Sequence, residues 1–574
     1  MNSTEKITGG QLLIRALKAH GIRRLFTLPG APLFPVYEAC LNEGVEVFVA
    51  RHESGLIHVA EGWSRATGNP SVVLVSPGPG LSNSVPGLSI AFAECSPVIL
   101  LSGIDVPANL GKGGRQELPQ VAMCAPITKW AALLSNGKRI PEHIAKAFRI
   151  AMNGMPGPVH ISITSDTLAE LVEVDESTVL PPANTQPAFA AQAEPAFIER
   201  ALDLLASAER PLIVAGAAAF WSHSGELLRQ FIETVKIPLM TVEQGRGLVP
   251  DNHPYCFGDG YGTVNQAAQL QGRVDVLLLL GDRLDHPLAY GSCFGQARII
   301  HICPDANEIG KNHPIECGVA CDVRAAMAQL LDAAKNREWK EPAAWVAMLR
   351  ETRNEQATRA KRMAASTQPG VHPARAALEV EAMLDEQSIL AFDGGDFSSW
   401  SRYCMTARRS GGWLASTVLG HLGVGLPYAM GAKLAFPDAK AVVMTGDGAM
   451  GFSAMEMETA VRYRIPVVVV VGNDAAFGVE VYYQQKWFGP DRVVGNELTN
   501  SRWDLLAESL GGHGEYVDAP EQLRPALERA FASGKPACVN VMIQRTPSPQ
   551  TQTFSRIYLL KRAHARKNAA PEID

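Results

Sequence analysis

Two aspartates that each follow an apolar segment are spaced as a metal site requires. Asp447 stands between two glycines directly after the strand-like segment 441–445, and Asp474 follows the next such segment, 466–471. One strand–helix–strand unit separates them, and parallel neighbouring strands end at the same sheet edge, where ligand sites of open α/β sheets lie. Two carboxylates together with diphosphate oxygens suit Mg²⁺. A tight turn is the alternative, and the second carboxylate favours a metal–diphosphate site over it.

A third carboxylate, Glu53, occupies a similar place in the first part of the chain. It follows the strand-like segment 45–50 and precedes a helical segment, 54–67. Taken alone, a solvated glutamate at a helix start is the better interpretation. Its value as a candidate comes from its combination with Asp447 and Asp474.

Short β-branched segments alternate with helical ones along the whole chain, which predicts α/β folding with parallel sheets covered by helices. Two changes of composition indicate domain boundaries: a Pro- and Ala-rich stretch at 180–195 and a charged helical stretch with its linker at about 336–371. We expect three Rossmann-like domains and a C-terminal tail. Their predicted ranges are 1–185, 190–340, 370–550 and 551–574.

The composition narrows the class of protein. The 574 residues, 47% hydrophobic and 19% charged, predict a globular protein of several domains, and a net charge of -6 gives no reason to expect a nucleic-acid partner. No signal peptide and no apolar stretch of membrane-spanning length is present. The closest of the ten cysteines, Cys317 and Cys321, suggest a metal site, but scattered thiols in a reduced cytosol are the favoured explanation. We therefore expect a cytoplasmic protein without a membrane partner.

Many ordered motifs resemble one family of thiamine-diphosphate (ThDP) enzymes, which contains acetolactate synthase, benzaldehyde lyase and 2-hydroxyacyl-CoA lyase. They include RHESGLIHVAEGWSRATG, SPGPGLSNSVPGL, STVLGHLGVGLPYAMGA and GDGAMGF…GND, and they extend along nearly the whole chain. The resemblance implies an N-terminal domain for the aminopyrimidine ring, a central Rossmann-like domain and a C-terminal domain for the diphosphate. It also implies a homodimer or homotetramer with each site between two subunits. Glu53 of one chain would then serve ThDP held by Asp447 of another.

The resemblance assigns chemistry to these residues. Glu53 would hydrogen-bond the pyrimidine and favour its imino form, which deprotonates the thiazolium, so that ThDP forms an acyl-anion equivalent while a C–C bond breaks or forms. Asp447, Asp474 and the carbonyl of Ala476 would hold Mg²⁺, with Asp474 replacing the family's usual Asn. Leu422 would wedge ThDP into its bent form. The remaining cofactor contacts predicted by resemblance are Gly395, Asp396, Phe397, Gly420, Gly446, Gly448, Ala449, Phe477 and Gly478.

The substrate is less defined. Gln116 matches an active-site glutamine, and a solvated loop residue is its alternative. The C-terminal third is most similar to benzaldehyde lyase, but Pro32 replaces a histidine of that enzyme and Val479 a smaller residue. The acetolactate synthases carry an arginine for the second keto acid where this chain has His286 followed by proline.

Several functions therefore stay open. A carboligase or lyase acting on 2-oxo acids or 2-hydroxy ketones is expected, with a 2-hydroxyacyl-CoA lyase or a 2-oxo acid decarboxylase as alternatives. The CoA alternative requires a basic patch, for which Arg402, Arg408 and Arg409 are candidates. A non-catalytic ThDP-fold protein is opposed by the presence of Glu53. Some relatives hold FAD in the central domain, and the sequence does not indicate whether this chain does.

Overall fold

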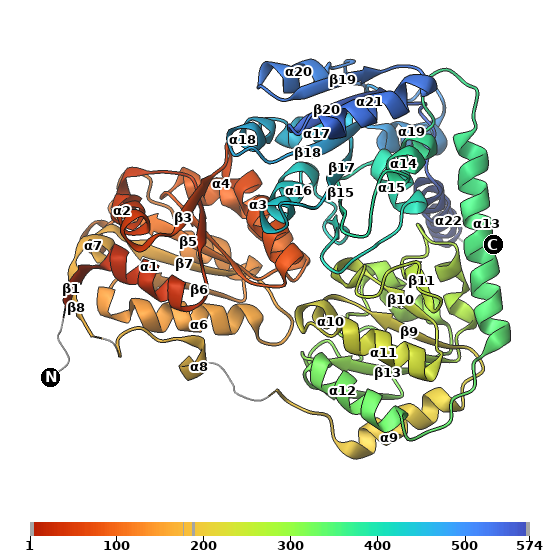
Figure 1. Ribbon diagram of the computed structural model, residues 1–574, viewed down its shortest axis with the longest axis horizontal. Helices are drawn as coiled ribbons and strands as arrows, with labels where there is room; N and C mark the ends of the chain where they lie inside the picture. The colour runs from red at the N-terminus through yellow and green to blue at the C-terminus, as the bar shows by residue number, and fades with distance from the viewer. Residues whose placement is uncertain (1–4, 176, 186–189, 570–574) are drawn as a thin grey trace.

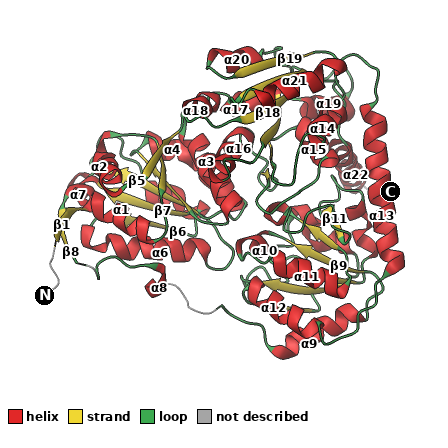
Figure 2. Cartoon of the chain, viewed as in Figure 1, coloured by secondary structure: helices red, strands yellow, loops and turns green. Residues whose placement is uncertain are grey.

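The computed structural model describes residues 5–175, 177–185 and 190–569, with side chains as far as Leu560, and the chain forms three domains (Figure 1). Each domain is built around a six-stranded sheet whose strands are all parallel. Helices cover the sheets on both faces (Figure 2). The predicted α/β class, with three parallel-sheet domains, is confirmed. In the described part of the chain, no helix combines the length and the apolar character needed to cross a membrane.

The N-terminal domain has the strand order β3-β2-β4-β5-β7-β6. Its strands are β2 (Arg24–Thr27), β3 (Glu46–Val49), β4 (Ser71–Val75), β5 (Val98–Ile104), β6 (Trp130–Leu134) and β7 (Val159–Thr164). Its main helices are α1 (Gly9–Ala19), α2 (Phe34–Glu43), α3 (Glu53–Thr67), α4 (Pro79–Ala93), α5 (Gln120–Cys124) and α6 (Ile140–Met152). An additional antiparallel pair joins β1 (Glu5–Thr8) to β8 (Leu171–Val174), and the short helices α7 (Ser165–Ala169) and α8 (Pro182–Thr185) flank β8 in the sequence.

The central domain has the order β11-β10-β9-β12-β13-β14. Its strands are β9 (Pro211–Ala215), β10 (Leu239–Thr241), β11 (Cys256–Asp259), β12 (Val276–Leu280), β13 (Arg298–Cys303) and β14 (Cys317–Ala320). Its helices are α9 (Pro195–Ala206), α10 (Ala217–Trp221), α11 (Gly225–Val235) and α12 (Val323–Ala334), after which the long α13 (Ala343–Ala364) leads to the next domain (Figure 1).

The C-terminal domain has the order β16-β15-β17-β18-β20-β19. Its strands are β15 (Ile389–Phe392), β16 (Trp413–Ala415), β17 (Ala441–Gly446), β18 (Val467–Asn473), β19 (His513–Val517) and β20 (Ala537–Met542). Its helices are α14 (Pro373–Glu381), α15 (Asp396–Cys404), α16 (Gly425–Ala435), α17 (Asp447–Ser453), α18 (Glu456–Arg462), α19 (Gly478–Phe488), α20 (Trp503–Ser509), α21 (Pro520–Ala532) and α22 (Pro549–Ala569).

The strand-like segments of the sequence form strands because they are apolar on both faces. All residues of β4, β12 and β18 are buried, as strands covered by helices on both sides must be. The predicted segment 441–445 lies within β17, and 466–471 largely coincides with β18. The helical part of the strand–helix–strand unit between Asp447 and Asp474 consists of two short helices, α17 and α18. Within the first predicted boundary, residues 186–189 lie outside the described residues.

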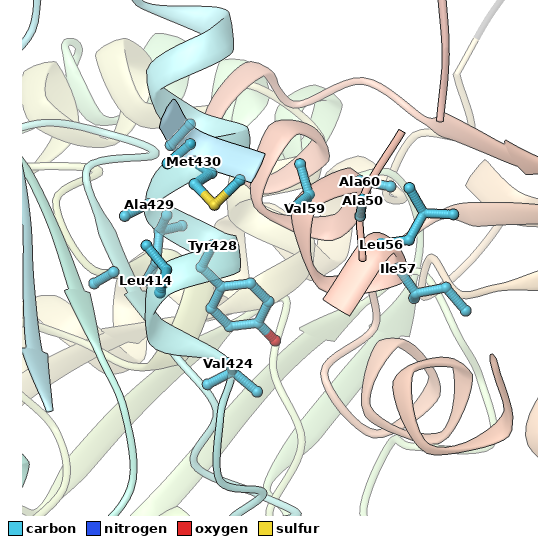
Figure 3. Packing of buried hydrophobic residues seen from close by; sticks show 14 of the residues in the cluster. Ala50, Leu56, Ile57, Val59, Ala60, Leu414, Val424, Tyr428, Ala429 and Met430 are labelled. Carbon is cyan, nitrogen blue, oxygen red and sulfur yellow. The ribbon is translucent and has the colours of Figure 1, made fainter. Parts of the chain in front are cut away.

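The N-terminal and C-terminal domains of one chain share a hydrophobic core. Helices α3 and α16 lie against each other at its centre, where Val59, Tyr428 and Met430 pack (Figure 3). Glycines let the two backbones approach: a Cβ on Gly62 would stand 2.4 Å from the carbonyl oxygen of Tyr428, and one on Gly431 would stand 2.0 Å from that of Val59. The two cofactor-type domains are therefore held together rigidly within the chain.

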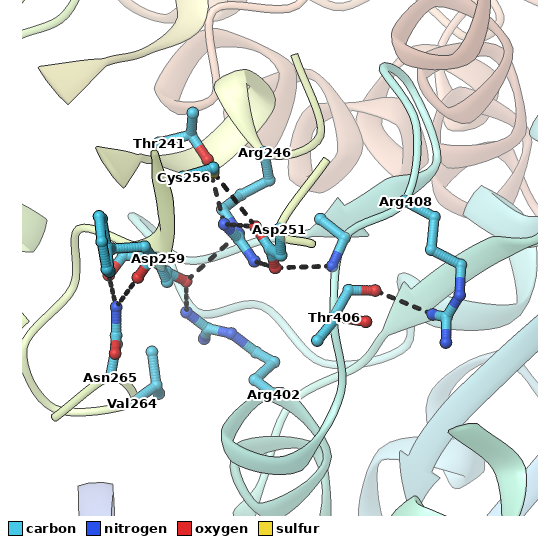
Figure 4. A network of polar contacts seen from close by, with 12 residues as sticks. Thr241, Arg246, Asp251, Cys256, Asp259, Val264, Asn265, Arg402, Thr406 and Arg408 are labelled. Carbon is cyan, nitrogen blue, oxygen red and sulfur yellow. Dashed lines mark hydrogen bonds and ion pairs between the residues drawn. The ribbon is translucent and has the colours of Figure 1, made fainter. Parts of the chain in front are cut away.

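Polar contacts join the central domain to the C-terminal one. The buried Arg246 pairs with Asp251 at 2.5 Å, and the Asp251 carboxylate also accepts the main-chain N–H of Ala407 at 2.8 Å (Figure 4). Arg402 reaches Asp259 at 3.5 Å across the same junction. Because buried charges are stable only when paired, these contacts fix how the two domains meet.

Candidate active site

A cavity of about 380 Å³ opens at the carboxyl ends of β15, β17 and β18. All of its lining residues lie between Pro373 and Pro547, so the C-terminal domain alone forms it. It gathers every cofactor contact predicted for that domain. These lining residues are Gly395, Asp396, Phe397, Gly420, Leu422, Gly446, Asp447, Gly448, Ala449, Asp474, Ala476, Phe477 and Gly478.

The two aspartates meet at one edge because their strands end level with each other. Gly446 of β17 pairs with Gly472 of β18; Asp447 follows Gly446, and Asp474 follows Asn473, the last residue of β18. Burial, and then the Asp474 carboxylate, raise the pKa of Asp447 to about 7. The Oδ2 atom of Asp447 is buried and has no hydrogen-bond partner among the described residues. An unpaired buried carboxylate oxygen beside a second carboxylate fits a bound cation.

The second aspartate is already partly neutralised. The Asp474 Oδ2 atom accepts a hydrogen bond from Arg545 Nε at 3.1 Å, and Arg545 Nη2 also donates to the Asp474 carbonyl at 2.7 Å. Burial nevertheless keeps the pKa of Asp474 above its usual value. Among the described residues, no three His, Cys, Asp or Glu side chains gather as a metal-binding group. The predicted third protein ligand is the main-chain carbonyl of Ala476, which also lines the cavity.

The turn that carries Leu422 is fixed against the end of β15. A Cβ on Gly394 would stand 2.1 Å from Leu422 Cδ2, so any side chain at position 394 would displace this leucine. The Asp393 carboxylate accepts the N–H groups of Gly423 at 2.8 Å and Gly425 at 3.0 Å. Leu422 is therefore held by both packing and hydrogen bonds, as the predicted wedge must be.

Asp396 lines the cavity, but its side chain has other partners. Its carboxylate accepts the Ser548 N–H at 3.0 Å and the Thr551 hydroxyl at 2.7 Å. It thereby attaches the start of α22 to the first turn of α15. The main-chain N–H groups at the N-terminus of α15 remain available for the predicted diphosphate contact, since such groups bind phosphate anions well.

Glu53 lies outside this cavity. It is the first residue of α3, is 5% exposed, and its Oε2 accepts a hydrogen bond from Asn83 Nδ2 at 3.0 Å. The strand end before it is anchored on the C-terminal domain of the same chain, because the Arg51 and His52 N–H groups both donate to the Glu456 carboxylate. Glu53 is therefore fixed by contacts of its own segment and does not line the cavity.

The four predicted substrate residues do not gather in a single chain. Val479 lines the cavity with the aspartates. His286 lines a second cavity, of about 990 Å³, between the central domain and α22, where Tyr261 contacts its Nε2 at 3.1 Å. Pro32 and Gln116 follow β2 and β5 on the Glu53 side of the N-terminal domain. Gln116 is held at a φ of +62°, a conformation that non-glycine residues rarely adopt.

Arg283, which precedes His286 in the sequence, and the three arginines considered for a CoA site all contact groups of the same chain. Arg283 pairs with Asp285 at 3.2 Å and donates to the Ala93 carbonyl at 3.1 Å. Arg408 pairs with Glu381 at 2.6 Å, and the Arg409 guanidinium lies 3.9 Å from the centre of the Phe436 ring. With Arg402 bound to Asp259, these side chains do not form a free basic patch.

Sequence reasoning missed several residues that shape the site. Asp393 follows β15 directly, so the strand-end argument used for Asp447 would have found it. Arg545 lies after β20 by the same argument. Asn83 lies within the motif SPGPGLSNSVPGL, but the motif alone assigns it no role, and no local pattern marks Glu94 at the end of α4.

Comparison with protein families gives matches to all three domains. The chain matches the N-terminal TPP binding domain of thiamine pyrophosphate enzymes over residues 7–123, their central domain over 198–330 and their C-terminal TPP binding domain over 393–541. Thiamine pyrophosphate (TPP) is another name for ThDP.

Curated relatives match over almost their whole length. The acetolactate synthase large subunit IlvG of Mycobacterium tuberculosis is 33% identical over 536 residues, which are 93% of this chain and 95% of the relative. The 2-hydroxyacyl-CoA lyase 2 of Bos taurus is 32% identical over 94% of this chain and 90% of its own. The human 2-hydroxyacyl-CoA lyase 1 is 27% identical over 96% and 97%.

The sheets, the strand-end aspartates and the relatives agree on one assignment. The three family matches follow one another in the same order as the three sheets. The suspected family is confirmed: the chain belongs to the thiamine pyrophosphate enzymes, and it is a TPP-dependent enzyme related to acetolactate synthases and 2-hydroxyacyl-CoA lyases.

Proposed function

We propose that the enzyme makes or breaks C–C bonds of 2-oxo acids or 2-hydroxy ketones, with ThDP and Mg²⁺ bound between two subunits. One observation carries the proposal: the residues expected to hold the diphosphate and metal line one cavity, while Glu53 stands on a different domain outside it. A cavity without its acid–base residue is half of a site. A second chain supplies the other half.

The carboxylate pair supports the metal. Asp447 has an unpaired buried oxygen, and the Asp474 carboxylate beside it raises the pKa of Asp447. A divalent cation would favour the ionised form of both side chains. Mg²⁺ keeps few protein ligands and bridges phosphate oxygens, which agrees with a site of two carboxylates and one carbonyl.

Apolar surface near the cavity supports the second subunit. Phe452 is 61% exposed and packs beside the turn at Gly423, while Leu419 is 52% exposed and Met455 48% exposed. Large apolar side chains gathered beside a functional turn mark an interface more often than free surface. A symmetric dimer would cover these residues and bring the partner's N-terminal domain to the cavity.

The bound cofactor supplies a carbon that takes up the acyl group and delocalises its charge. The protein residues position it and move protons. Glu53, oriented by Asn83, holds a proton at the pyrimidine nitrogen, and burial keeps water from competing for it. Leu422 would pack against the bound cofactor, and the main-chain N–H groups at the N-terminus of α15 would receive its diphosphate.

The proposed substrate class rests on one arginine of the relatives that is replaced here and on arginines that are already paired. Pro287 stands where the acetolactate synthases carry their keto-acid arginine, and Arg283 is occupied by Asp285 and Ala93. The small-molecule acceptor is therefore proposed to be neutral, an aldehyde or ketone. A 2-hydroxyacyl-CoA lyase is the second candidate, favoured by its similar relatives and opposed by the pairing of Arg402 and Arg408.

The test is a substrate panel with ThDP and Mg²⁺. Pyruvate, benzoylformate, benzoin, acetoin and a 2-hydroxyacyl-CoA are incubated separately, and products are identified by chromatography and mass spectrometry. A 2-hydroxy ketone formed from or cleaved to aldehydes is the expected result. Cleavage of the CoA thioester alone would assign the lyase alternative, and turnover that persists after ThDP is removed would refute the proposal.

A further inference from the structure

The turn that shapes the cofactor cavity lies in a long irregular connection. Residues 416–424 join β16 to α16 and form neither helix nor strand. They include Gly420 and Leu422, both of which line the cavity. A segment of this kind loses its shape unless other groups bind its main chain. Its C-terminal side is held by Asp393, which lies in the same domain.

The N-terminal side of the connection is held from a different domain. Glu94, at the end of α4, is fully buried, and its Oε1 accepts the main-chain N–H groups of Thr417 at 2.8 Å and Val418 at 3.0 Å. The Ser416 hydroxyl contacts the same oxygen at 3.3 Å. One carboxylate oxygen of the N-terminal domain therefore binds three consecutive residues of the C-terminal domain.

A buried arginine completes this contact. Arg65 of α3 is 2% exposed and donates to the Ala415 carbonyl at 2.9 Å, one residue before the segment bound by Glu94. Arg65 also lies 3.8 Å from the Glu61 carboxylate. The positive charge of Arg65 balances buried carboxylates, which would otherwise be costly in this environment.

The central domain also contacts Glu94 and the connection that it binds. Gln244 donates to the main-chain carbonyl of Glu94, and Glu243 accepts from the Thr417 hydroxyl at 3.4 Å. Burial and the neighbouring Glu94 raise the pKa of Glu243 well above its usual value. All three domains thus meet at Thr417, three residues before Gly420.

We propose that Glu94 and Arg65 are a positioning pair, through which the N-terminal domain of a chain sets the shape of the cofactor turn on its own C-terminal domain. Neither residue lines the cavity, and both act through residues 415–418 on Gly420 and Leu422. The inference rests on the proposed function, because only a bound ThDP makes the shape of this turn matter for activity.

The test compares three variants of the full-length enzyme. Glu94→Ala removes the acceptor, and Glu94→Gln keeps one acceptor oxygen without the charge. Asp251→Asn is the matched control, because Asp251 is also a buried carboxylate that accepts a main-chain N–H of the C-terminal domain, that of Ala407, away from the turn. Thermal unfolding of each variant records its loss of stability.

Two readouts separate positioning from general stability. Hydrogen exchange by mass spectrometry follows peptides across 413–424 in the cofactor-free enzyme, and calorimetry gives the affinity for ThDP with Mg²⁺ present. In Glu94→Ala we expect faster exchange in these peptides and an affinity weaker by roughly ten- to a hundredfold, because the buried hydrogen bonds that hold residues 416–418 are lost. Glu94→Gln is expected to recover part of the affinity. Asp251→Asn is expected to bind ThDP as the wild type does.

The outcomes distinguish the inference from the proposed function. Wild-type enzyme that binds no ThDP would overturn both. Wild-type binding with unchanged affinity in both Glu94 variants would overturn the positioning role alone. If Glu94→Ala does not fold, Glu94→Gln decides: an affinity loss no larger than that of an equally destabilised Asp251→Asn would also overturn it.

Discussion

Replacing Asp447 by asparagine should stabilise the cofactor-free enzyme while it weakens cofactor binding. Burial, and then the Asp474 carboxylate, raise the pKa of Asp447 from 3.8 to about 7. That difference corresponds to about 4 kcal/mol against the ionised form, since each tenfold change in an ionisation constant is worth about 1.4 kcal/mol. Asparagine occupies the same volume without the charge. The gain in the free energy of unfolding should not exceed this value, because water in the cavity solvates part of the Asp447 charge.

The raised pKa of Asp447 also predicts how the stability difference between variant and wild type changes with pH. Because the folded-state pKa of Asp447 lies above the unfolded value, the penalty is absent below about pH 3.8, grows between there and about pH 7, and is complete above. The variant should therefore melt several degrees above the wild type at pH 8 and at the same temperature at pH 4. Both proteins are melted without metal or ThDP.

The control is Asp504, a buried carboxylate whose pKa is lowered where that of Asp447 is raised. Asp504 is paired with Arg502 at 2.6 Å, and although burial raises its pKa, the bonds from Arg502 leave that pKa below the usual value. Asp504→Asn should lower the melting temperature at pH 8. In the same preparations, Asp447→Asn should bind Mg²⁺ and ThDP much more weakly in calorimetry. A destabilised apo-enzyme with unchanged cofactor affinity would refute the role given to Asp447.

Three further predictions concern residues of the N-terminal domain. Glu53→Gln should remove nearly all turnover while calorimetry still detects ThDP binding; near-normal turnover would contradict the acid–base role. Pro32→His should raise acyloin cleavage, measured as aldehyde release from benzoin, and no gain would remove the analogy with benzaldehyde lyase. Burial lowers the pKa of His160 to about 4, so its neutral form contributes stability that is lost as pH falls from 6.5 to about 4. His160→Gln should remove about 3 kcal/mol of that acid-induced loss in denaturation experiments, and an unchanged pH profile would show that His160 is not its source.

That Asp447, Asp474 and the glycines around them line one cavity was predictable, because their positions depend on local order. Asp447 and Asp474 follow β17 and β18, which one strand–helix–strand unit connects and which pair in the sheet, and the glycines around them lie in the same short segments. Asp393 obeys the same rule and was overlooked only because its loop was considered for other residues. A sequence pattern therefore locates groups that one strand–helix–strand unit positions.

Contacts between domains were beyond such reasoning. Glu94 ends a helix without any motif, and its meaning arises from Thr417 and Val418, more than three hundred residues later. The Asp396 carboxylate is bound by Ser548 and Thr551, on either side of the boundary predicted between the C-terminal domain and the tail. These positions depend on how finished domains pack, and local periodicity carries no information about that packing.

Mixing two inactive variants tests the central claim, that each site combines Glu53 of one subunit with Asp447 of another. Glu53→Gln and Asp447→Asn enzymes are purified separately, then unfolded and refolded together at equal concentration with ThDP and Mg²⁺. A mixed dimer contains one site with both residues intact, so random pairing predicts recovery of about a quarter of wild-type activity. Refolding each variant alone should recover none. A mixture as inactive as its components, in which mass spectrometry nevertheless detects mixed dimers, would contradict a site shared between subunits.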